Sequence, residues 1–475
     1  GTFLIGTIFL KDGVTLDLHP AGRLLGSPRL EDYIAKSWGQ HIDRTPWHLV
    51  VCAGVKDVTI RGGGTIDGNG PAFWEPCVEG PLRPADVEVP PGAFGGLHAL
   101  SCVAARHAAE PAKAAIAWIR ANKEKRPSPM IEVTGCSNLR IQDVRIANSA
   151  GWLLHLHNSR YVWIRGVRLE SNLYGPNNDG FDITGCQDVM VSDCHLSCCD
   201  DAICLKTTPD SLPIERVTVT NCIIRTRCVA LKFGCAESFH DFRQVTFSNC
   251  VVYESSRAVG LYTKEGGVIE DVTITNIVCE SKNPFLANRP IHIDCMRQSP
   301  TSKLGRIRNV LISNVVCRTD GRILLTGKAE SPLENIVLRD IVVAYPTIDD
   351  PAPIAARIPC GQFSPQNPEA RAARAVVVAE HVKNLVVDNL IVTWPETDAE
   401  GRIQVPAGWD FTIKAVNGGF DQFFQKAEYN TGRIPDFAVL WGRNVQGGYL
   451  RAPLAEPPRA GLPVCDLAGS SIRVL

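Results

Sequence analysis

Three aspartates in one short stretch have the residue type and spacing for acid–base chemistry. Asp179 lies in a Pro-Asn-Asn-Asp-Gly turn, and Asp200 and Asp201 follow 21 and 22 residues later. Two neighbouring carboxyl groups can hydrolyse a glycosidic bond, because one protonates the leaving oxygen while another activates water. Crowded carboxylates also raise one another's pKa, which keeps an acid protonated near neutrality. Taken singly, each motif is weak and is better explained as an ordinary turn or a calcium site; their spacing by the coil period is what favours the chemical interpretation.

A recurring strand pattern is what would bring these acids together. The eight-residue template reads apolar, any, apolar, any, Asn/Asp/Gly, apolar, any, apolar. Its fifth positions are Asp143, Gly166, Asp193, Asn221, Asn249, Asn276, Asn314, Asp340 and Asn389. Most successive copies are 23 to 28 residues apart, which is typical of the coils of a parallel β-solenoid that stack at about 4.8 Å and bury a common core. A βα arrangement would need helices in gaps that are too short and too rich in β-formers.

We therefore predict an all-β chain with a single parallel β-helix domain over residues 1–399. Because the acids are spaced by about one coil, stacking should place them on one face. Residues 76–128 interrupt the repeat and are predicted to be an insertion, with a helix over 109–125. The insertion could wall a cleft or be a plain surface excursion. Residues 400–475 are predicted to form a C-terminal cap or a segment that folds back along the rod.

The chain has 18 cysteines, many of them at repeat positions between valines and isoleucines. Small apolar side chains pack well there, so we predict mostly buried free thiols and not a disulfide framework. Cys194, Cys222 and Cys250 are each 28 residues apart and should form an interior ladder. The Asn or Asp residue before each of them favours the left-handed backbone that a coil corner needs.

The overall composition excludes several classes of protein. Hydrophobic residues make up 45% of the chain, and the net charge is -1, so no strong field favours nucleic acid or an anionic membrane. No apolar run is long enough for a membrane span. No signal peptide is visible, but the first residues already have the pattern of a strand, as if the chain entered mid-structure.

Several other polar residues are candidates for substrate binding. They are Asn177, Lys206, Lys232, Tyr262 and Lys264. A lysine beside a carboxylate cluster suits an anionic sugar, although a solvated surface lysine is the plain alternative. The histidines show no spacing typical of a metal site, so they are predicted to be internally satisfied or at the surface. These are His155, His157, His195, His240 and His292.

At these residues the sequence resembles the polygalacturonase family, glycoside hydrolase family 28. The Asn-Asn-Asp-Gly and Cys-Asp-Asp-Ala motifs stand where the family has Asn-Thr-Asp-Gly and Gly-Asp-Asp-Cys. The resemblance implies a right-handed parallel β-helix, a glycosidase that inverts the anomeric centre, and no required metal or other cofactor. By this match Asp200 is the general acid, and Asp179 and Asp201 activate the water. It also favours a secreted or periplasmic location and an oligo- or polysaccharide of the pectin type as substrate.

Two departures from the family pattern bear on the substrate. The family's Gly-His-Gly motif falls near Cys228 or Val229, and its Arg-Ile-Lys motif aligns with Tyr262, Thr263 and Lys264. The histidine and the arginine are thus replaced. We expect a variant glycan as substrate, and an aromatic ring at position 262 could stack on a sugar. The acid and the base are expected to lie about 6.5–9.5 Å apart, as inversion requires room for water.

Two other functions remain open at the level of sequence. A polysaccharide lyase or a glycan transferase could use the same fold, with Lys264 as the base and the acids holding calcium. A non-catalytic glycan-binding β-helix would bind a glycan without turnover, and the missing histidine and arginine give it weight.

Overall fold

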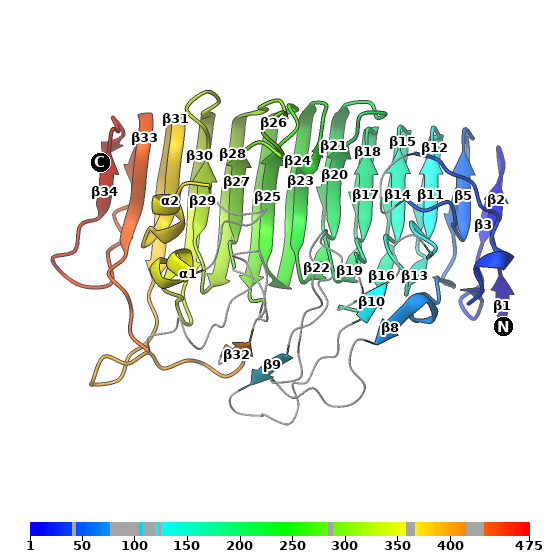
Figure 1. Cartoon of the computed structure of the whole chain (residues 1–475), viewed down its shortest axis with the longest axis horizontal. Helices are drawn as coiled ribbons and strands as arrows, with labels where there is room; N and C mark the ends of the chain where they lie inside the picture. The colour runs from blue at the N-terminus through cyan, green and yellow to red at the C-terminus, as the bar shows by residue number, and fades with distance from the viewer. Residues whose placement is uncertain are drawn as a thin grey trace.

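A computed structural model gives the architecture. It describes residues 1–39, 44–76, 104–107, 119–121, 125–173, 175, 177–283, 288–357, 366–409, 411–414 and 432–475. In this part of the chain, 31 strands form one continuous sheet whose strands pair in parallel from coil to coil. The sheet winds into a long rod with the two chain ends at opposite ends (Figure 1). The prediction of a parallel β-helix is therefore confirmed.

Each coil contributes strands to three faces of the rod. The first face consists of β2 (Ile8–Leu10), β5 (Val50–Ala53), β11 (Ile131–Thr134), β14 (Leu154–His157), β17 (Phe181–Thr184), β20 (Ile203–Thr207), β23 (Val229–Ser238), β25 (Arg257–Thr263), β27 (Ile291–Cys295) and β29 (Ile323–Thr326). The first halves of β31 (Ala375–Thr393) and β33 (Ala438–Arg451) and then β34 (Cys465–Ala468) extend it.

The other two faces follow the same stacking. The second face contains β3 (Thr15–Asp17), β6 (Thr59–Arg61), β12 (Ser137–Gln142), β15 (Arg160–Arg165), β18 (Gln187–Ser192) and β21 (Ile214–Thr220). The third contains β1 (Thr2–Ile5), β4 (Arg23–Gly26), β7 (Thr65–Asp67), β13 (Arg145–Ala147), β16 (Arg168–Glu170), β19 (His195–Cys198), β22 (Ile223–Thr226) and β35 (Arg473–Val474). The long strands β24 (Phe242–Ser255), β26 (Val268–Ser281), β28 (Arg306–Thr319) and β30 (Leu333–Ala344) run across both of these faces.

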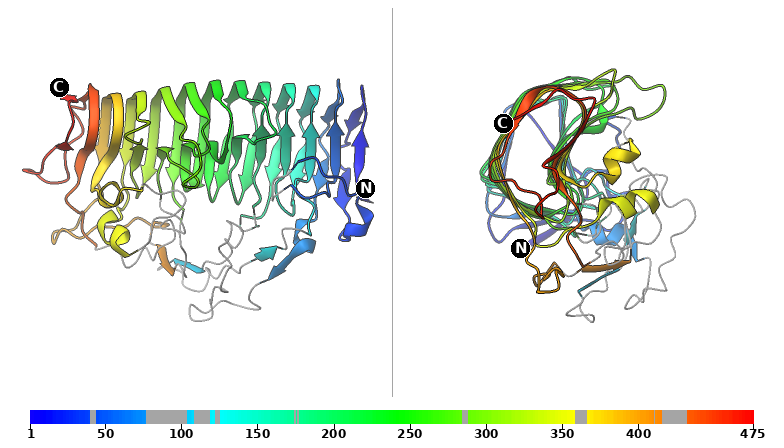
Figure 2. Two further views of the ribbon diagram at one scale, coloured as in Figure 1. Left: turned by 45° about the horizontal axis from the view of Figure 1, so that its top comes forward. Right: turned by 90° about the vertical axis from the view of Figure 1, so that its left-hand side faces the viewer.

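The remaining elements lie outside the coils. They are η1 (Leu30–Asp32), η2 (Gly70–Phe73), β8 (Trp74–Pro76), β9 (Ala104–His107), β10 (Ile119–Ala121), α1 (Pro351–Arg357), α2 (Pro368–Ala372) and β32 (Phe411–Lys414). The view along the rod in Figure 2 shows the coils in superposition, with α1 and α2 outside their outline. Among the described residues, no helix has the length and apolarity needed to cross a membrane.

Two predictions about the irregular segments need comment. Within the predicted helix at 109–125, Ile119–Ala121 forms strand β10, which pairs antiparallel with β8, so the prediction is wrong there. Residues 108–118 and 122–124 lie outside the described residues. Within 400–475, β33 pairs in parallel with β31, and β34 and β35 pair with β33. Part of this segment therefore adds further coils, and the division at residue 400 stays a prediction.

The interior explains why the repeat folds in this way. Alternate residues point inward and form one continuous core, for example Ile131, Leu154, Phe181 and Ile203 on the first face. The predicted thiol ladder is present, because Cys222 contacts both Cys194 and Cys250 in the interior. The structure contains free thiols at every cysteine of the described residues. The core thus comes from stacking coils, as the sequence pattern indicates.

Asparagine stacks at the coil corners supply a testable feature of the fold. Asn276 adopts φ 57, donates through Nδ2 to Asn249 Oδ1 at 2.9 Å and accepts at Oδ1 from Asn314 Nδ2 at 3.1 Å. We expect Asn276→Ala to lower the free energy of unfolding by about 1–2 kcal/mol, because alanine resists the left-handed backbone and loses both hydrogen bonds. Asn276→Gly should cost less, since glycine accepts that backbone.

Urea unfolding of the three proteins would measure this difference. Val278→Ala, at an exposed site on the same strand, is the control and should change the stability by no more than about 0.5 kcal/mol. Equal losses for the alanine and glycine variants would contradict the backbone argument.

Candidate active site

The three aspartates meet because the turns before two neighbouring strands of the first face stack on each other. Asp179 precedes β17, and Asp200 and Asp201 precede β20. The Gly180 N–H donates to the Asp201 carbonyl at 2.8 Å, and Asn177 Nδ2 donates to Asp200 Oδ2 at 3.3 Å. All three acids are buried. The structure therefore brings together Asn177 and the acids that the spacing singled out.

Two lysines reach this cluster from the outward side of the first face. Lys206 Nζ lies 2.7 Å from Asp182 Oδ1 and 3.4 Å from Asp179 Oδ2, and it sits 3.6 Å from the centre of the Trp152 ring. Lys232 Nζ donates to Asp201 Oδ2. Both lysines are buried. They therefore neutralise the aspartates, and their contacts with substrate stay a prediction.

The same contacts separate the acids electrostatically. Burial raises the pKa of Asp200 to about 6, with Asp201 adding to the effect and Lys232 opposing it. Burial also raises the pKa of Asp179 well above its usual value, with help from Asp182 and Asp200. For Lys206, burial alone would lower the pKa, but Asp182 and Asp179 outweigh it and raise the pKa well above the usual value. A proton therefore resides readily on Asp200 near pH 6.

Cys228 and Val229 are the two positions at which the family histidine was expected. Cys228 Sγ and one oxygen each of Asp200 and Asp201 lie within 4.8 Å of one another. Val229 is also fully buried, and its carbonyl accepts from the Ala202 N–H at 2.9 Å. Burial, followed by Asp201 and Asp200, raises the pKa of the Cys228 thiol well above its usual value. A neutral thiol can donate a hydrogen bond to Asp200, but it cannot exchange a proton near neutrality as an imidazole can.

The separation expected between the acid and the base stays a prediction. An oxygen of Asp200 and one of Asp201 lie within 4.8 Å of each other. The cause is local, because the two residues are adjacent in one turn and the Asp201 N–H donates to Asp200 Oδ1 at 3.0 Å. The three side chains could also hold a cation, although the Lys232 ammonium already neutralises Asp201.

Tyr262 and Lys264 belong to a second polar cluster farther along the first face. The Tyr262 hydroxyl lies 3.2 Å from His292 Nδ1, and the two rings meet edge to face at 5.1 Å. Tyr262 is fully buried, so the expected stacking of its ring on a sugar is not supported. Asp294 Oδ1 accepts from Thr326, and burial raises the pKa of Asp294 to about 6 although Thr326 and Lys264 oppose this. The positive charge of Lys264 thus favours the ionised form of Asp294.

Sequence reasoning missed several polar residues on the outward side of the first face. Glu132, His155 and Asp182 stack in register there, one per coil. Glu132 accepts from Arg44 at 2.7 Å and pairs with His155 Nδ1 at 2.8 Å, and His155 Nε2 lies 3.0 Å from Thr184 Oγ1. The prediction that His155 is internally satisfied is therefore confirmed. The available signal for Asp182 was its alternation with the inward residues Phe181 and Ile183.

His292 is the predicted histidine that lies in the second cluster. It is buried, its Nδ1 meets Tyr262, and its Nε2 has no hydrogen-bond partner within the described residues. Burial lowers its pKa well below the usual value, and Arg289 and Arg257 lower it further. His292 is therefore neutral near pH 7, and its free nitrogen lies in the second cluster beside Asp294.

Fold and site together define a parallel β-helix protein with a carboxyl-rich site on one face. A family model described as Glycosyl hydrolases family 28 matches residues 96–355, more than half of the chain. The chain belongs to this family, as the sequence motifs indicated.

Curated relatives agree with this assignment at low identity. A "Probable polygalacturonase" of Vitis vinifera is 22% identical over 298 residues, which are 59% of this chain and 52% of that protein. "Polygalacturonase QRT2" of Arabidopsis thaliana is 21% identical over 276 residues, 56% of this chain and 52% of that protein. The chain thus spans about half the length of these relatives.

Solved structures show the same fold. An exopolygalacturonase from Thermotoga maritima superposes with a TM-score of 0.58 and 20% identity, over 83% of this chain and 82% of that one. A polygalacturonase from Erwinia carotovora ssp. carotovora gives a TM-score of 0.53 and 16% identity, over 72% and 83%. The predicted right-handed parallel β-helix is confirmed.

Proposed function

We propose that the protein is a glycoside hydrolase that cleaves a pectin-like acidic glycan, with Asp200 as the general acid and inversion at the anomeric carbon. The observation that supports this proposal is that two adjacent carboxyl groups have different surroundings. Asp201 is bound by the Lys232 ammonium, whereas Asp200 accepts from a neutral amide and has a pKa raised to about 6 by burial. Such a pair supplies one acid and one base.

Each group then has a defined role. Asp200 donates its proton to the leaving oxygen of the glycosidic bond. Asp201, which pairs with the Lys232 ammonium, accepts a proton from the attacking water. Family resemblance implies that Asp179 shares the activation of water, but burial and two neighbouring acids raise its pKa. We therefore give Asp179 the role of positioning the water, and Asp201 that of the base.

Inversion follows from the family resemblance. In an inverting glycosidase the base activates a water molecule on the face of the sugar opposite the leaving oxygen, and no carboxylate attacks the anomeric carbon. The anomer of the first product tests this assignment.

The substrate class rests on the relatives and on the charge of the site. The named relatives are polygalacturonases, and polygalacturonate carries a carboxylate on each sugar. Lys206 and Lys232 pair with aspartates of the acid cluster, whereas Lys264 lies in the second cluster and opposes there the burial that raises the pKa of Asp294. Tyr262 in place of arginine favours a glycan whose sugars are not all uronates, such as a rhamnogalacturonan-type backbone.

Product analysis tests this proposal. The protein should release reducing ends from at least one glycan in a panel that contains polygalacturonate, rhamnogalacturonan and non-pectic polymers. Proton NMR of the first product should show the anomer opposite to that of the bond cleaved. A retained anomer would overturn inversion, and an unsaturated product absorbing in the ultraviolet would identify a lyase. Binding to a glycan without turnover would identify a binding module.

A further inference from the structure

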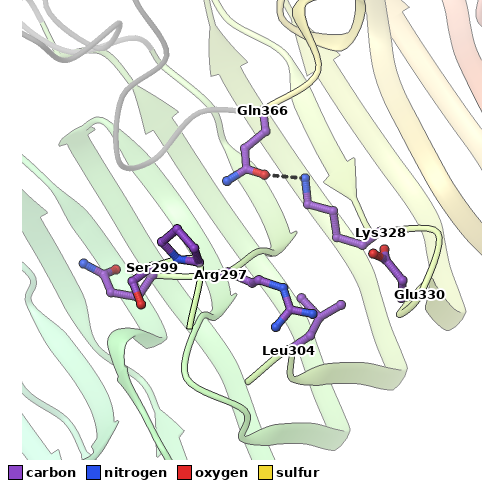
Figure 3. Close-up of a pocket in the computed structure, with 8 residues that line it drawn as sticks. Arg297, Ser299, Leu304, Lys328, Glu330 and Gln366 are labelled. Atoms are coloured by element: carbon purple, nitrogen blue, oxygen red, sulfur yellow. Dashed lines mark hydrogen bonds between the residues drawn. The ribbon is translucent and has the colours of Figure 1, made fainter. Parts of the chain in front are cut away.

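A surface pocket lies beyond the second polar cluster, where the chain leaves two neighbouring strands of the first face. It has a volume of about 390 Å³. Figure 3 shows the side chains around it, which include Arg297, Ser299, Leu304, Lys328, Glu330 and Gln366. Arg297 and Ser299 follow β27, whereas Lys328 and Glu330 follow β29. Neighbouring coils therefore supply the two cations.

The pocket lies at the other end of the first-face strands from the acids, because the acids precede β17 and β20 whereas the pocket residues follow β27 and β29. The Gln298 N–H donates to the Lys264 carbonyl at 3.0 Å, and the Met296 N–H donates to the Thr263 carbonyl at 3.1 Å. The loop that carries Arg297 is thus bound directly to the loop that carries Lys264. β20 is followed on the first face by β23, β25, β27 and β29. At about 4.8 Å a coil, the pocket lies roughly 14–19 Å along the rod from the acids, and the length of a first-face strand separates the two sites across the face.

The chemistry of the pocket suits an anion. Lys328 Nζ donates to Gln366 Oε1 at 2.7 Å, a contact drawn in Figure 3, and Arg297 Nη1 donates to the Ser302 carbonyl. These contacts fix both cations by neutral groups and leave their charges in place. Glu330 is the single acid in the lining, so the side chains carry a net charge of +1. An arginine fork and a lysine together can bind a carboxylate.

We propose that this pocket binds a carboxylate-bearing sugar of an acidic polysaccharide whose chain lies along the first face from the acid cluster. The substrate class rests on the proposed function, whereas the pocket and its charge do not. A glycan that reaches from Asp200 to the pocket must span three to four coils and also cross the first face from one end of its strands to the other. The pocket therefore selects long uronate-containing chains over short oligosaccharides.

Binding to an inactive protein tests the pocket apart from catalysis. In an Asp200→Asn background, the dissociation constant for polygalacturonate is measured by titration calorimetry at low salt. Arg297→Gln and Lys328→Gln should each raise it by about tenfold, the value of one lost charge-assisted hydrogen bond. Glu330→Gln should lower it, because a repelling charge is removed. Trigalacturonate, too short to span this distance, should bind equally to all variants. Added salt should shrink the differences.

Lys383→Gln is the matched control. This exposed lysine lies on β31 opposite Glu334 of β30, on the second face, and the substitution changes the net charge equally. Its binding should equal that of the background protein. Two results would contradict the proposal that the pocket binds the glycan. One is a dissociation constant that Lys383→Gln raises as much as the pocket variants do, and the other is no binding of polygalacturonate by the background protein.

Turnover measurements on proteins with Asp200 intact distinguish the two proposals. If Arg297→Gln and Lys328→Gln leave the turnover rate on polygalacturonate unchanged, the proposal that the pocket binds the glycan is contradicted, but the proposed hydrolase activity is not. Binding that depends on both residues in a protein without turnover on any glycan would confirm the pocket and overturn the hydrolase.

Discussion

Replacing Asp200 with asparagine is expected to lower kcat by about 100- to 10,000-fold, the usual contribution of a general acid. Asparagine keeps the size of the side chain and can still meet Asn177, so substrate binding and the fold should change little. The raised pKa of Asp200, about 6 because of burial, leaves the carboxyl group half protonated at pH 6. The substitution removes that proton donor without removing Asp201 or Lys232. Steady-state kinetics on the best substrate of the glycan panel measures the effect.

The pH dependence separates an acid from a merely structural residue. In the wild-type protein, kcat should fall about tenfold for each pH unit above 6, because Asp200 loses the proton that it must donate. The residual activity of Asp200→Asn should lack this alkaline limb. Asp193→Asn is the matched control, since Asp193 lies at an exposed corner with φ 57, a backbone that asparagine also accepts. A fully active Asp200→Asn protein, or an unchanged alkaline limb, would contradict the assignment.

The coil architecture was predictable because each coil repeats the same physical requirement. Inward residues must be apolar, and corners must accept a left-handed backbone, so the template recurs wherever a coil turns. Asn221, Asn249, Asn276 and Asn314 all have φ between 53 and 57. The strand at Ile119–Ala121 was not predictable in this way, because its partner β8 is distant in sequence and the pairing is not part of the repeat.

The acid cluster was predictable for the same reason, whereas its partners were not. Spacing by one coil places Asp179 above Asp200, but spacing does not say which buried cation neutralises which carboxylate. Lys232 reaches Asp201, and Lys206 reaches Asp182, because both lysines point outward from first-face strands next to those acids. Tyr262 was expected to face a sugar, yet it packs against Cys228, Val229 and Cys235. Burial on the outward side of a coil depends on what covers it, and the repeat carries no information about that cover.

Replacing Lys206 with methionine is expected to destabilise the protein by about 3–5 kcal/mol at pH 8, the usual cost of breaking a buried ion pair. Methionine retains most of the apolar stem above Trp152 but leaves Asp182 and Asp179 without their shared cation. Burial raises the pKa of Asp182 to about 7 even with Lys206 opposing it. Without the lysine that pKa rises further, so both acids must be buried charged or take up protons. Chemical unfolding at several pH values measures the loss.

The deficit should depend on pH in a defined direction. An acid whose pKa is raised by folding stabilises the folded state fully below its unfolded pKa of about 3.9, and this contribution is lost as the pH rises through the folded pKa. Since Lys206→Met moves the folded pKa of Asp182 upward, the loss of stability should be small at pH 5 and largest at pH 8. Adding Asp182→Asn should recover part of it, because the uncompensated charge is removed. Arg216→Met, which breaks an exposed pair with Asp188 at 2.7 Å, should cost no more than about 1 kcal/mol at either pH. A pH-independent deficit, or one no larger than that of Arg216→Met, would show that Lys206 does not neutralise buried carboxylates.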